Sequence, residues 1–490
     1  MTEKKFSCIA IDMGAGSIRV MLGTLDGEGI SYREIHRITN EIIESDGHDR
    51  WDMDCIWKEI KKGITKTIEY SENAPSSVGV DSWGVDFVLL DEQGELVETP
   101  VAYRDSRTEG MQEKWGTMMS PMDTFRRTGI NFYIFNTLFQ MLSLKDSEVM
   151  KKTSRILFIP SYINYLLTGT AHNETTISST SQMLGVEGNK WDTDILEKLH
   201  INPANLGDVV APGTRLGPVK IPEAEGTGME GIAACGHDTA CVVAALPVEN
   251  PNFAYISAGT WCIVGVESDQ PLISEEALEL GLTNERGYNN TYRTLKNIVG
   301  LWLLQGLKKH LPPDTSFTQM EEMTKEGGAI MQVIDPDDPG FYNPEDMKEA
   351  FDAYFDGTDQ ARPENFGAYL LCAYDSLCFS FRYHIEKLEV LSGKPIEVLH
   401  LVGGGSQSDY LNQRIATICG RKVVSGPVEG ATLGNILIQA LALGRIESLE
   451  EGRSLVRKCY PVKTYLPLSE SSRTVQRYET FLSLKQKSNK

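Results

Sequence analysis

Hydrophobic and polar positions follow two patterns along this chain, one typical of strands and one typical of helices. In each half, predicted strands come first and longer helical patterns follow. Short apolar runs bounded by turn residues predict strands early in the first half. Isoleucines then recur at helical spacing across residues 51–68, which predicts an amphipathic helix. A mostly helical region is expected from 108 to 206. The predicted strands of this half are 8–11, 20–25, 30–35, 77–80, 85–90 and 232–235.

The second half repeats the theme of apolar strands followed by longer helical patterns. Its predicted strands are 253–257, 262–266 and 398–402, and its predicted helices are 366–391, 411–419, 431–443 and a polar surface helix within 469–490. Strands followed by helices in both halves predict an α/β fold of two domains around mixed sheets. The proline-containing stretch 246–251 is the best candidate for the link. We therefore expect domains at 1–246 and 252–446 and a helical tail at 447–490.

Composition and charge narrow the classes of partner. The chain has 490 residues with 41% hydrophobic content and a formal net charge of -21, which argues against binding to nucleic acid or to an anionic membrane. An anionic nucleotide stays possible, because backbone N–H groups and a bound cation create local positive sites. No apolar run is long enough for a bilayer, and the nine cysteines are scattered singly. These features predict a cytoplasmic protein with reduced thiols.

A turn of small residues at 12–17 is a candidate phosphate site. It lets main-chain N–H groups approach phosphate oxygens, while Ser17 can add a hydroxyl and Arg19 a cation. Asp12 stands at a strand end, where a carboxylate can hold Mg²⁺ through water. An ordinary glycine hairpin would explain this turn by itself. A second turn of the same kind at 258–260 favours the phosphate interpretation.

Asp238 is the candidate catalytic residue. It follows Gly236 and His237 at the end of a predicted strand, where a carboxylate can accept the proton of a sugar hydroxyl during phosphoryl transfer. His237 could donate a hydrogen bond to the substrate, and Thr239 could orient the substrate. The alternative is that Asp238 caps a helix at 239–245.

Other motifs admit both a functional and a structural explanation. Gly403, Gly404 and Gly405 follow a strand and could receive a flat ring or a ribose, or could form a tight connection to a helix. The segment 82–86 combines Trp83 with Asp86, which suits a sugar but also suits a core tryptophan beside a turn. Asn297 is either a ligand for a hydroxyl or a helix N-cap.

Two common nucleotide motifs are absent or misplaced. No Gly-x4-Gly-Lys-Ser/Thr sequence occurs, so a P-loop enzyme is not expected. The one Gly-x-Gly-x-x-Gly, at 226–231, precedes a predicted strand instead of leading from a strand into a helix. We interpret it as a loop, which removes most of the support for a dinucleotide-dependent oxidoreductase.

Almost end to end, the chain resembles the FGGY family of carbohydrate kinases. The segments that carry the resemblance are 82–91, 100–107, 236–239, 295–298, 301–305 and 402–405. The resemblance implies two actin-like ATPase (ribonuclease-H-like) domains with an interdomain cleft that holds ATP and a sugar. It also implies Mg²⁺- and ATP-dependent phosphorylation of the 1-hydroxyl of L-rhamnulose in L-rhamnose catabolism.

The resemblance also assigns residues to the site. Asp238 would be the proton acceptor, with Gly84, His237, Thr239 and Asn297 at the sugar. The residues that would hold ATP are Ala15, Gly16, Ser17, Ile18 and Arg19 from the first domain and Thr260, Gln305 and Gly404 from the second. Family members that act on L-rhamnulose often read Gly-Ala-Ser-Ser-Gly-Arg in the first turn, whereas this chain shifts its glycine and serine at 14–19. Contacts at 16–18 are therefore less well defined than the turn itself.

Two rival functions remain open at the level of sequence. The first is the same chemistry on another ketose, such as L-fuculose or L-xylulose. The second is an actin-like ATPase that acts as a conformational switch and needs no sugar. Oligomeric state has no signature in the sequence.

Overall fold

The computed structural model describes residues 6–27 and 29–488 and contains two compact units. Unit 1 consists of Met1–Pro247, Glu267–Thr294 and Glu429–Cys459, and unit 2 of Val248–Val266, Leu295–Val428 and Tyr460–Lys490. Two segments from the second half of the chain therefore pack with the N-terminal residues. The domain boundaries expected from the sequence run linearly along the chain and stay a prediction.

A six-stranded sheet forms the centre of unit 1, in the order β11-β12-β6-β1-β2-β3. Its strands are β1 (Phe6–Met13), β2 (Ser17–Asp26), β3 (Gly29–Thr39), β6 (Ser77–Ser82), β11 (Arg215–Pro218) and β12 (Glu230–Ile232). The strands β1, β2 and β3 form an antiparallel meander, while β6 and β12 run parallel to β1. The residues of β1 and β6 are buried almost without exception, because helices cover both faces of the sheet.

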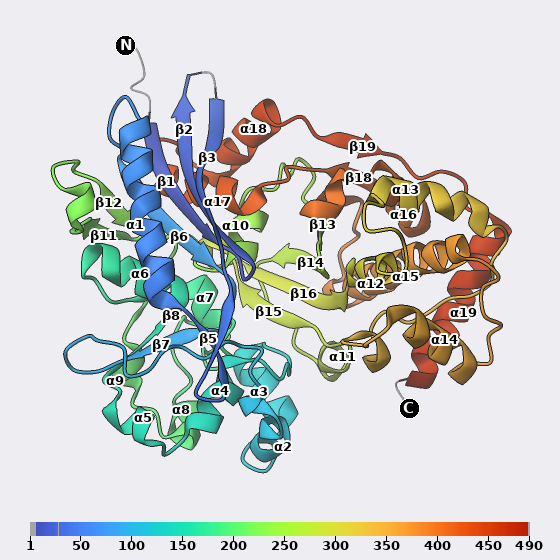
Figure 1. Cartoon of the computed structure of the whole chain (residues 1–490), viewed down its shortest axis with the longest axis horizontal. Coiled ribbons are helices and arrows are strands. Elements are labelled where there is room, and N and C mark those ends of the chain that lie inside the picture. Colours follow the sequence, from blue (N-terminus) through green and yellow to red (C-terminus); the bar gives the residue numbers. More distant parts are fainter. Residues whose placement is uncertain (1–5, 28, 489–490) are drawn as a thin grey trace. The chain divides into compact units, whose positions relative to one another are not determined.

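Different helices cover the two faces of this sheet (Figure 1). On one face, α1 (Met53–Tyr70) lies so close that a Cβ at Gly63 would meet Val20 of β2. On the other face, α17 (Gly430–Ala442) approaches β6, where a Cβ at Gly79 would meet Asn435 and Gln439. The helix α10 (Asp238–Ala244) packs against α17. The helix α17 therefore contacts both β1 and α10, so it helps to position the end of the strand and the start of the helix.

The remaining elements of unit 1 surround this core. The short strands are β4 (Ile42–Ser45), β5 (His48–Trp51), β7 (Phe87–Leu90), β8 (Arg155–Phe158), β9 (Asn173–Glu174) and β10 (Val209–Val210). The helices are α2 (Met111–Gly116), α3 (Pro121–Thr128), α4 (Thr137–Leu144), α5 (Glu148–Lys152), α6 (Ile159–Thr168), α7 (Thr175–Ser179), α8 (Thr193–Leu199), α9 (Pro203–Leu206), α11 (Glu275–Glu279) and α18 (Leu449–Cys459).

A second sheet has seven strands in the order β15-β16-β14-β13-β17-β18-β19. They are β13 (Phe253–Ala258), β14 (Trp261–Ser268), β15 (Thr283–Arg286), β16 (Tyr292–Val299), β17 (Val398–Val402), β18 (Lys422–Ser425) and β19 (Lys463–Tyr465). The helices of unit 2 are α12 (Trp302–Lys308), α13 (Phe317–Met323), α14 (Met347–Gly357), α15 (Phe366–Ser392), α16 (Asp409–Cys419) and α19 (Ser472–Ser488). The mostly buried helix α15 packs against α16.

Most predicted elements are present, with two informative differences. The strand predicted at 232–235 does not form over that range. The observed strand β12 ends at Ile232, and an irregular segment leads from there to Asp238. Asn297 lies inside the strand β16, so the helix N-cap interpretation is wrong. The glycine motif 226–231 is a loop that enters β12, as expected, and Gly226 and Gly228 have positive φ. None of the helices in the described part of the chain combines the length and apolar composition needed to cross a membrane.

Candidate active site

Three carboxylates come together at one edge of the sheet in unit 1. Asp12 of β1 and Asp81 of β6 are partners in the register of these parallel strands. Beyond the end of β12, the N–H of Ser82 donates to the carbonyl of Gly236 at 2.9 Å, which holds the segment before Asp238 beside β6. The carboxyl ends of neighbouring parallel strands meet at the same edge, so the sheet order itself assembles this cluster.

The acidic cluster is electrostatically strained. Burial raises the pKa of Asp12 to about 6, and the charges of Asp238 and Glu429 add to this rise while Arg19 opposes it. Burial and the charge of Asp12 likewise raise the pKa of Asp81 well above its usual value. Within the described residues, Oδ1 of Asp81 is buried with no hydrogen-bond partner. A cation placed here would relieve both the repulsion and the unmet bonding capacity.

The two carboxylate oxygens of Asp238 have different surroundings, since one contacts neighbouring residues and the other does not. Oδ1 accepts from the N–H of Thr239 and from the Thr239 hydroxyl at 3.0 Å, and it lies 3.4 Å from His237 Nε2. Oδ2 makes no hydrogen bond or ion pair within residues 6–27 and 29–488, and the side chain is 33% exposed. Asp238 is the first residue of α10, whose N-cap is His237, so Asp238 does not cap the helix in the way that the alternative required. One oxygen is therefore available to a ligand.

The imidazole of His237 is held by a buried ion pair. Glu285 lies 2.8 Å from Arg293 Nη2, and His237 Nδ1 lies 3.0 Å from both partners. Burial alone would raise the pKa of Glu285, but Arg293 and His237 outweigh it and lower this pKa to about 2. Nδ1 of His237 therefore faces both the Glu285 carboxylate and the Arg293 guanidinium, while Nε2 faces Asp238 Oδ1.

Gly84 lies directly against this pair of residues. A Cβ built at Gly84 would stand 3.4 Å from His237 Nε2 and 3.4 Å from the Thr180 side chain. The structure therefore brings together Gly84, His237, Asp238 and Thr239, all in unit 1. A bare backbone at Gly84 leaves room beside the imidazole for a ligand.

Trp83 and Asp86 belong to the core, which is the structural explanation that the sequence left open. Both are buried, and the indole rings of Trp83 and Trp51 have centroids 4.5 Å apart. Asp86 Oδ2 accepts from both indole N–H groups and from the Tyr103 N–H, while Oδ1 accepts from Gln140. These groups use both carboxylate oxygens, so Asp86 supports the neighbourhood of Gly84 without offering a free oxygen.

The first glycine turn is a tight hairpin between β1 and β2. The N–H of Gly14 donates to the carbonyl of Ser17 at 3.0 Å, and a Cβ at Gly16 would meet nothing within 4 Å. Ala15, Gly16 and Ser17 are accessible, whereas the side chain of Ile18 is fully buried. Only the first three of these residues can therefore present side chains or a bare backbone to phosphate.

Arg19 is engaged in ion pairs instead of pointing into open space. Its Nη2 lies 2.6 Å from Asp12 Oδ2, and its Nη1 contacts Glu429 at the start of α17. Thr432 of the same helix donates to Asp12 Oδ2 at 3.1 Å. A phosphate would have to compete with these carboxylates for Arg19. The pairs explain how α17 keeps Asp12 in place.

The second turn, in unit 2, is built by close packing of glycines. A Cβ at Gly403, where φ is +79°, would lie 2.9 Å from the Ala258 carbonyl, and one at Gly405 would lie 2.6 Å from the Ala258 Cβ. A Cβ at Gly404 would meet nothing within 4 Å. Two of the three glycines are thus required by the contact with β13, while Gly404 leaves open space for a ligand.

Thr260 and Gln305 form the other side of this turn. The Thr260 hydroxyl and the Gln305 side-chain amide are within 3.4 Å, and the Thr260 carbonyl accepts from the Trp302 N–H at 3.1 Å. Three of the predicted nucleotide contacts, Thr260, Gln305 and Gly404, are therefore grouped about one turn of unit 2. Asn297 lies in β16, which is the neighbour of β14 in the same sheet.

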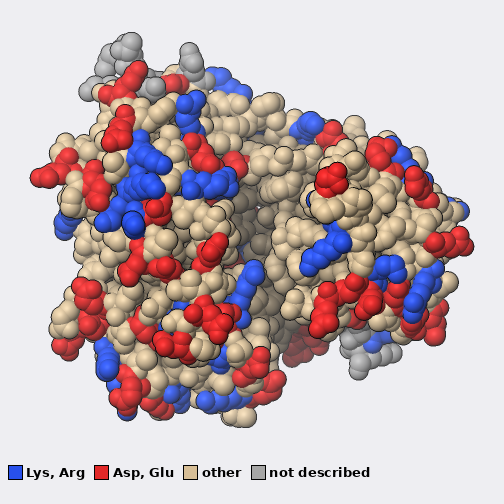
Figure 2. All heavy atoms as spheres, in the orientation of Figure 1, with Lys and Arg blue, Asp and Glu red and all other residues tan. Residues whose placement is uncertain are grey.

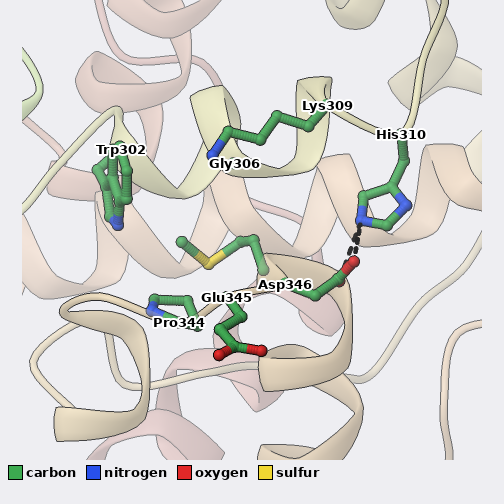
Figure 3. A pocket seen from close by; sticks show the side chains of 8 residues that line it. Trp302, Gly306, Lys309, His310, Pro344, Glu345 and Asp346 are labelled. Atoms are coloured by element: carbon green, nitrogen blue, oxygen red, sulfur yellow. Dashed lines mark hydrogen bonds and ion pairs between the residues drawn. The ribbon is translucent and has the colours of Figure 1, made fainter.

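Two hollows are present among the described residues, one in unit 2 and one in unit 1. One, of about 100 Å³, is lined by Trp302, Lys309 and His310 of the α12 region and by Asp346, which pairs with His310 (Figure 3). The other, of about 250 Å³, surrounds Arg107 in unit 1.

The sequence itself decides the family. The profile of the FGGY family of carbohydrate kinases, N-terminal domain, matches residues 7–245, and that of the C-terminal domain matches residues 254–443. The chain belongs to the FGGY family of carbohydrate kinases. Its activity is therefore ATP-dependent phosphorylation of a sugar, as the resemblance predicted.

Curated relatives are similar to this FGGY kinase over nearly its whole length. A protein named Rhamnulokinase from Bacillus subtilis (strain 168) is 39% identical over 463 residues, covering 94% of this chain and 95% of the relative. A Rhamnulokinase from Bacteroides thetaiotaomicron is 38% identical and covers 94% of this chain and 96% of the relative.

Solved structures support the fold class. A gluconate kinase from Lactobacillus acidophilus superposes with a TM-score of 0.83 at 16% identity, covering 99% of each chain. A xylulose kinase from the same organism gives a TM-score of 0.81 at 16% identity, covering 98% of each chain. The prediction of an α/β fold with two actin-like domains is confirmed.

Sequence reasoning missed several residues that shape the site. Asp81 had a visible signal, since it is a carboxylate inside an otherwise apolar strand. Glu285, Arg293 and Glu429 had none, because each reaches the site from a segment distant in the chain. The predicted site residues of unit 1 and of unit 2 form two separate groups of neighbours, one in each unit.

Proposed function

We propose that this FGGY kinase transfers the γ-phosphate of ATP to the 1-hydroxyl of L-rhamnulose, giving L-rhamnulose 1-phosphate and ADP in L-rhamnose catabolism. The observation that carries the choice of substrate is the match to relatives named Rhamnulokinase, five of which are 36–39% identical over 93–94% of this chain. The geometry about Asp238 supports the type of reaction.

In the proposed reaction, Oδ2 of Asp238 removes the proton from the 1-hydroxyl of the ketose. The oxygen then forms a bond to the γ-phosphorus as the bond between this phosphorus and the β–γ bridging oxygen breaks, and ADP leaves. A positioned general base contributes about 10²–10⁴ in rate. The imidazole of His237, the Thr239 side chain and the bare backbone at Gly84 would orient the sugar, together with Asn297 of unit 2.

ATP would bind through the two glycine turns. Ala15, Gly16 and Ser17 would meet the phosphates from unit 1, with Thr260, Gln305 and Gly404 contacting the nucleotide from unit 2. The accessible backbone at Gly16 and Gly404 supports this assignment. Ile18 could contribute only its backbone, and Arg19 would have to leave Asp12 or Glu429.

Mg²⁺ fits the acidic edge formed by Asp12 and Asp81. Both carboxyl groups are buried with raised pKa, and an unpartnered oxygen of Asp81 is available, so a divalent cation would stabilise their ionised forms. Asp12 would hold the ion through water. When bound, the ion would neutralise charge on the phosphates. Within the described ranges no group of three His, Cys, Asp or Glu side chains is arranged as a metal site.

A panel of ketoses tests the substrate. We would measure kcat/KM for L-rhamnulose, L-fuculose and L-xylulose by coupling ADP release to an optical assay, with ATP held in excess. The highest kcat/KM is expected for L-rhamnulose, with one ADP formed per sugar phosphorylated. A higher kcat/KM for either of the other ketoses would reassign the substrate.

The same assay separates the kinase from an actin-like switch. A switch predicts ATP turnover that is indifferent to added sugar, whereas the proposed function predicts ADP release only in proportion to sugar. We also place the reaction in the cytoplasm, where ATP is supplied and where the nine free thiols stay reduced.

A further inference from the structure

The hollow around Arg107 shares no lining residue with the acidic edge, the glycine turns or the predicted sugar contacts. It lies wholly within unit 1, between His48 of β5, the helix α2 and the end of α4, and the two helices pack against each other (Figure 1). Its volume of about 250 Å³ is far more than the roughly 10–15 Å³ that one water needs. We call it the Arg107 hollow.

The guanidinium of Arg107 is a cation with too few acceptors. Its Nη2 donates to Gln140 Oε1 at 2.6 Å, whereas its Nε is buried with no hydrogen-bond partner within the described residues. No carboxylate of the described ranges lies within 4 Å of it, and the Phe87 ring lies 5.8 Å away on one side. Burial accordingly lowers the pKa of Arg107. A buried cation with an unmet donor is unfavourable unless an anion approaches it.

The two acidic side chains nearest to the hollow are already engaged. Glu98 Oε2 lies 3.3 Å from Arg50 Nη1. Asp105 Oδ1 lies 3.1 Å from His48 Nδ1 and accepts from the backbone N–H of Arg107 at 2.9 Å. These contacts hold both carboxylates beyond ion-pair distance of the Arg107 guanidinium. The positive charge of Arg107 is therefore not neutralised by a direct contact.

A second cation borders the same hollow. Lys114 is an exposed residue of α2, and its ammonium makes no hydrogen bond or ion pair within the part of the chain that the structure describes. Arg107 offers a planar fork of donors fixed by Gln140, and Lys114 offers a mobile point charge. Tetrahedral oxyanions bind well between these two kinds of donor.

From this arrangement we propose that the Arg107 hollow binds a small oxyanion of the phosphate class, separately from the sugar and the nucleotide. The anion would accept from the free donors of Arg107 and pair with Lys114. Inorganic phosphate and the phosphate group of a ketose 1-phosphate present the same chemistry. The inference goes beyond the proposed function and does not depend on which ketose is phosphorylated.

Calorimetric titration with inorganic phosphate tests the site. The protein is first saturated with Mg²⁺ and a non-hydrolysable ATP analogue, so that phosphate cannot bind where the nucleotide does, and ionic strength is held constant with sodium chloride. We expect one phosphate per chain. Arg107→Gln and Lys114→Ala should each weaken its affinity by roughly 10-fold, the order expected for one charge-assisted hydrogen bond. Lys114→Arg should keep the affinity within about 3-fold, because it retains the charge.

Lys152→Ala is the matched control, since it removes an exposed lysine of α5 that does not line the hollow. It should leave the affinity for phosphate unchanged. Circular dichroism and thermal unfolding verify that each variant is folded. If Arg107→Gln does not fold, the exposed Lys114 still decides the outcome.

A second titration uses the ketose 1-phosphate that the enzyme forms, and only the binding that Lys114→Ala weakens is assigned to the hollow. Tighter binding than that of inorganic phosphate would make the product the ligand, and equal or weaker binding would make it free phosphate. The inference would be overturned by the absence of binding, by affinities that Lys114→Ala leaves unchanged, or by an equal loss in Lys152→Ala. A chain that phosphorylates no ketose would reject the proposed function, whereas the phosphate titration would still test the hollow.

Discussion

At the scale of single residues, the chemistry of the site depends on how His237 and Asp238 are held. The N–H and hydroxyl of Thr239 donate to Oδ1 of Asp238, and His237 Nε2 lies near the same oxygen. Oδ2 is therefore left for a substrate hydroxyl. His237 in turn is fixed by Glu285 and Arg293. The proton acceptor is thus oriented by neighbours on its own helix and by one buried ion pair.

Replacing the acceptor should stop turnover without unfolding the protein. Asp238→Asn keeps the shape and the bonds to Thr239 but cannot take a proton. We expect kcat to fall by at least about 10²-fold while the affinity for ATP, measured by calorimetry with a non-hydrolysable analogue, stays nearly unchanged. Asp314→Asn, at an exposed position of unit 2, is the control. Near-normal turnover of Asp238→Asn would remove this residue from the mechanism.

The pH dependence of stability should report the ion pair behind His237. The pKa of Glu285 is lowered to about 2 in the folded protein, whereas its ordinary value is 4.5. The ionised group therefore stabilises the fold fully above about pH 4.5, and this stabilisation is lost as the pH falls toward 2. A shift of this size corresponds to about 3 kcal/mol.

Glu285→Gln provides the measurement. At pH 6 its free energy of unfolding should be lower than that of the wild type by about 3 kcal/mol, and denaturant titrations at pH 6, 5, 4 and 3.5 should show this gap narrowing. A gap that stays constant across this range would show that the charge of Glu285 is not responsible.

The sequence could identify the residues whose role is local, but not those that arrive from a distance. Asp238, Gly84 and the two glycine turns are recognisable from their neighbours in the chain. Glu285 and Glu429 are ordinary acidic residues in sequence, and only the tertiary structure brings them to His237 and Arg19. Arg19 itself was predicted for phosphate, but its pairing with Asp12 could not be foreseen.

At the scale of elements, the position of Asp238 depends on the crossing of α10 and α17. These helices meet at Gly434, where an added Cβ would clash with the backbone of Cys241 in α10. Gln439 and Asn435 of α17 also bond to the sheet, through the Ile9 carbonyl and the Asp81 carboxylate. The helix α17 therefore fixes both the sheet edge and the helix that begins at Asp238.

A single methyl group at this crossing should displace α10. Gly434→Ala should lower the free energy of unfolding by about 1–3 kcal/mol through overpacking, and kcat should fall because Asp238 moves with its helix. Gly116→Ala, at the end of α2 where a Cβ would meet nothing within 4 Å, is the control and should be neutral or slightly stabilising. Unchanged stability in Gly434→Ala would mean that the two helices can separate freely.

The elements themselves were largely predictable, because hydrophobic period and turn residues mark them. The strand β17 has the predicted bounds, α15 ends one residue later than expected, and α17 is shifted by one residue at both ends. The strand expected at 232–235 failed, since its apolar residues are buried without pairing along their full length. A short apolar run such as 232–235 looks the same in sequence whether it is only buried or is also paired in a sheet.

At the scale of the whole molecule, the two units are not consecutive in the chain. Unit 1 is completed only by Glu267–Thr294 and Glu429–Cys459, and the second of these segments contains α17. On the face drawn in Figure 2, basic side chains are interspersed among the acidic ones of this chain, whose net charge is -21. Segments that are distant in the chain therefore share a compact unit.

This arrangement predicts the behaviour of a fragment. Residues 1–247 lack α17, which packs against β1, β2 and β6 and whose Leu433, Ile436 and Leu437 are buried. We expect the fragment to bind a hydrophobic dye and to unfold without a cooperative transition, whereas the full chain unfolds cooperatively. A fragment that joins 429–459 to 1–247 through a flexible linker should recover much of the cooperativity. A cooperative transition in 1–247 alone would contradict the assignment.

The late return of α17 also has a consequence for biosynthesis. A ribosome adds about 5–20 residues per second, so the N-terminal sheet must wait on the order of ten seconds or more for its missing helix to emerge. During that interval the surface that later packs against α17, with its buried Leu433 and Ile436, stays exposed. Nascent chains of this enzyme should therefore engage ribosome-associated chaperones until translation passes Cys459.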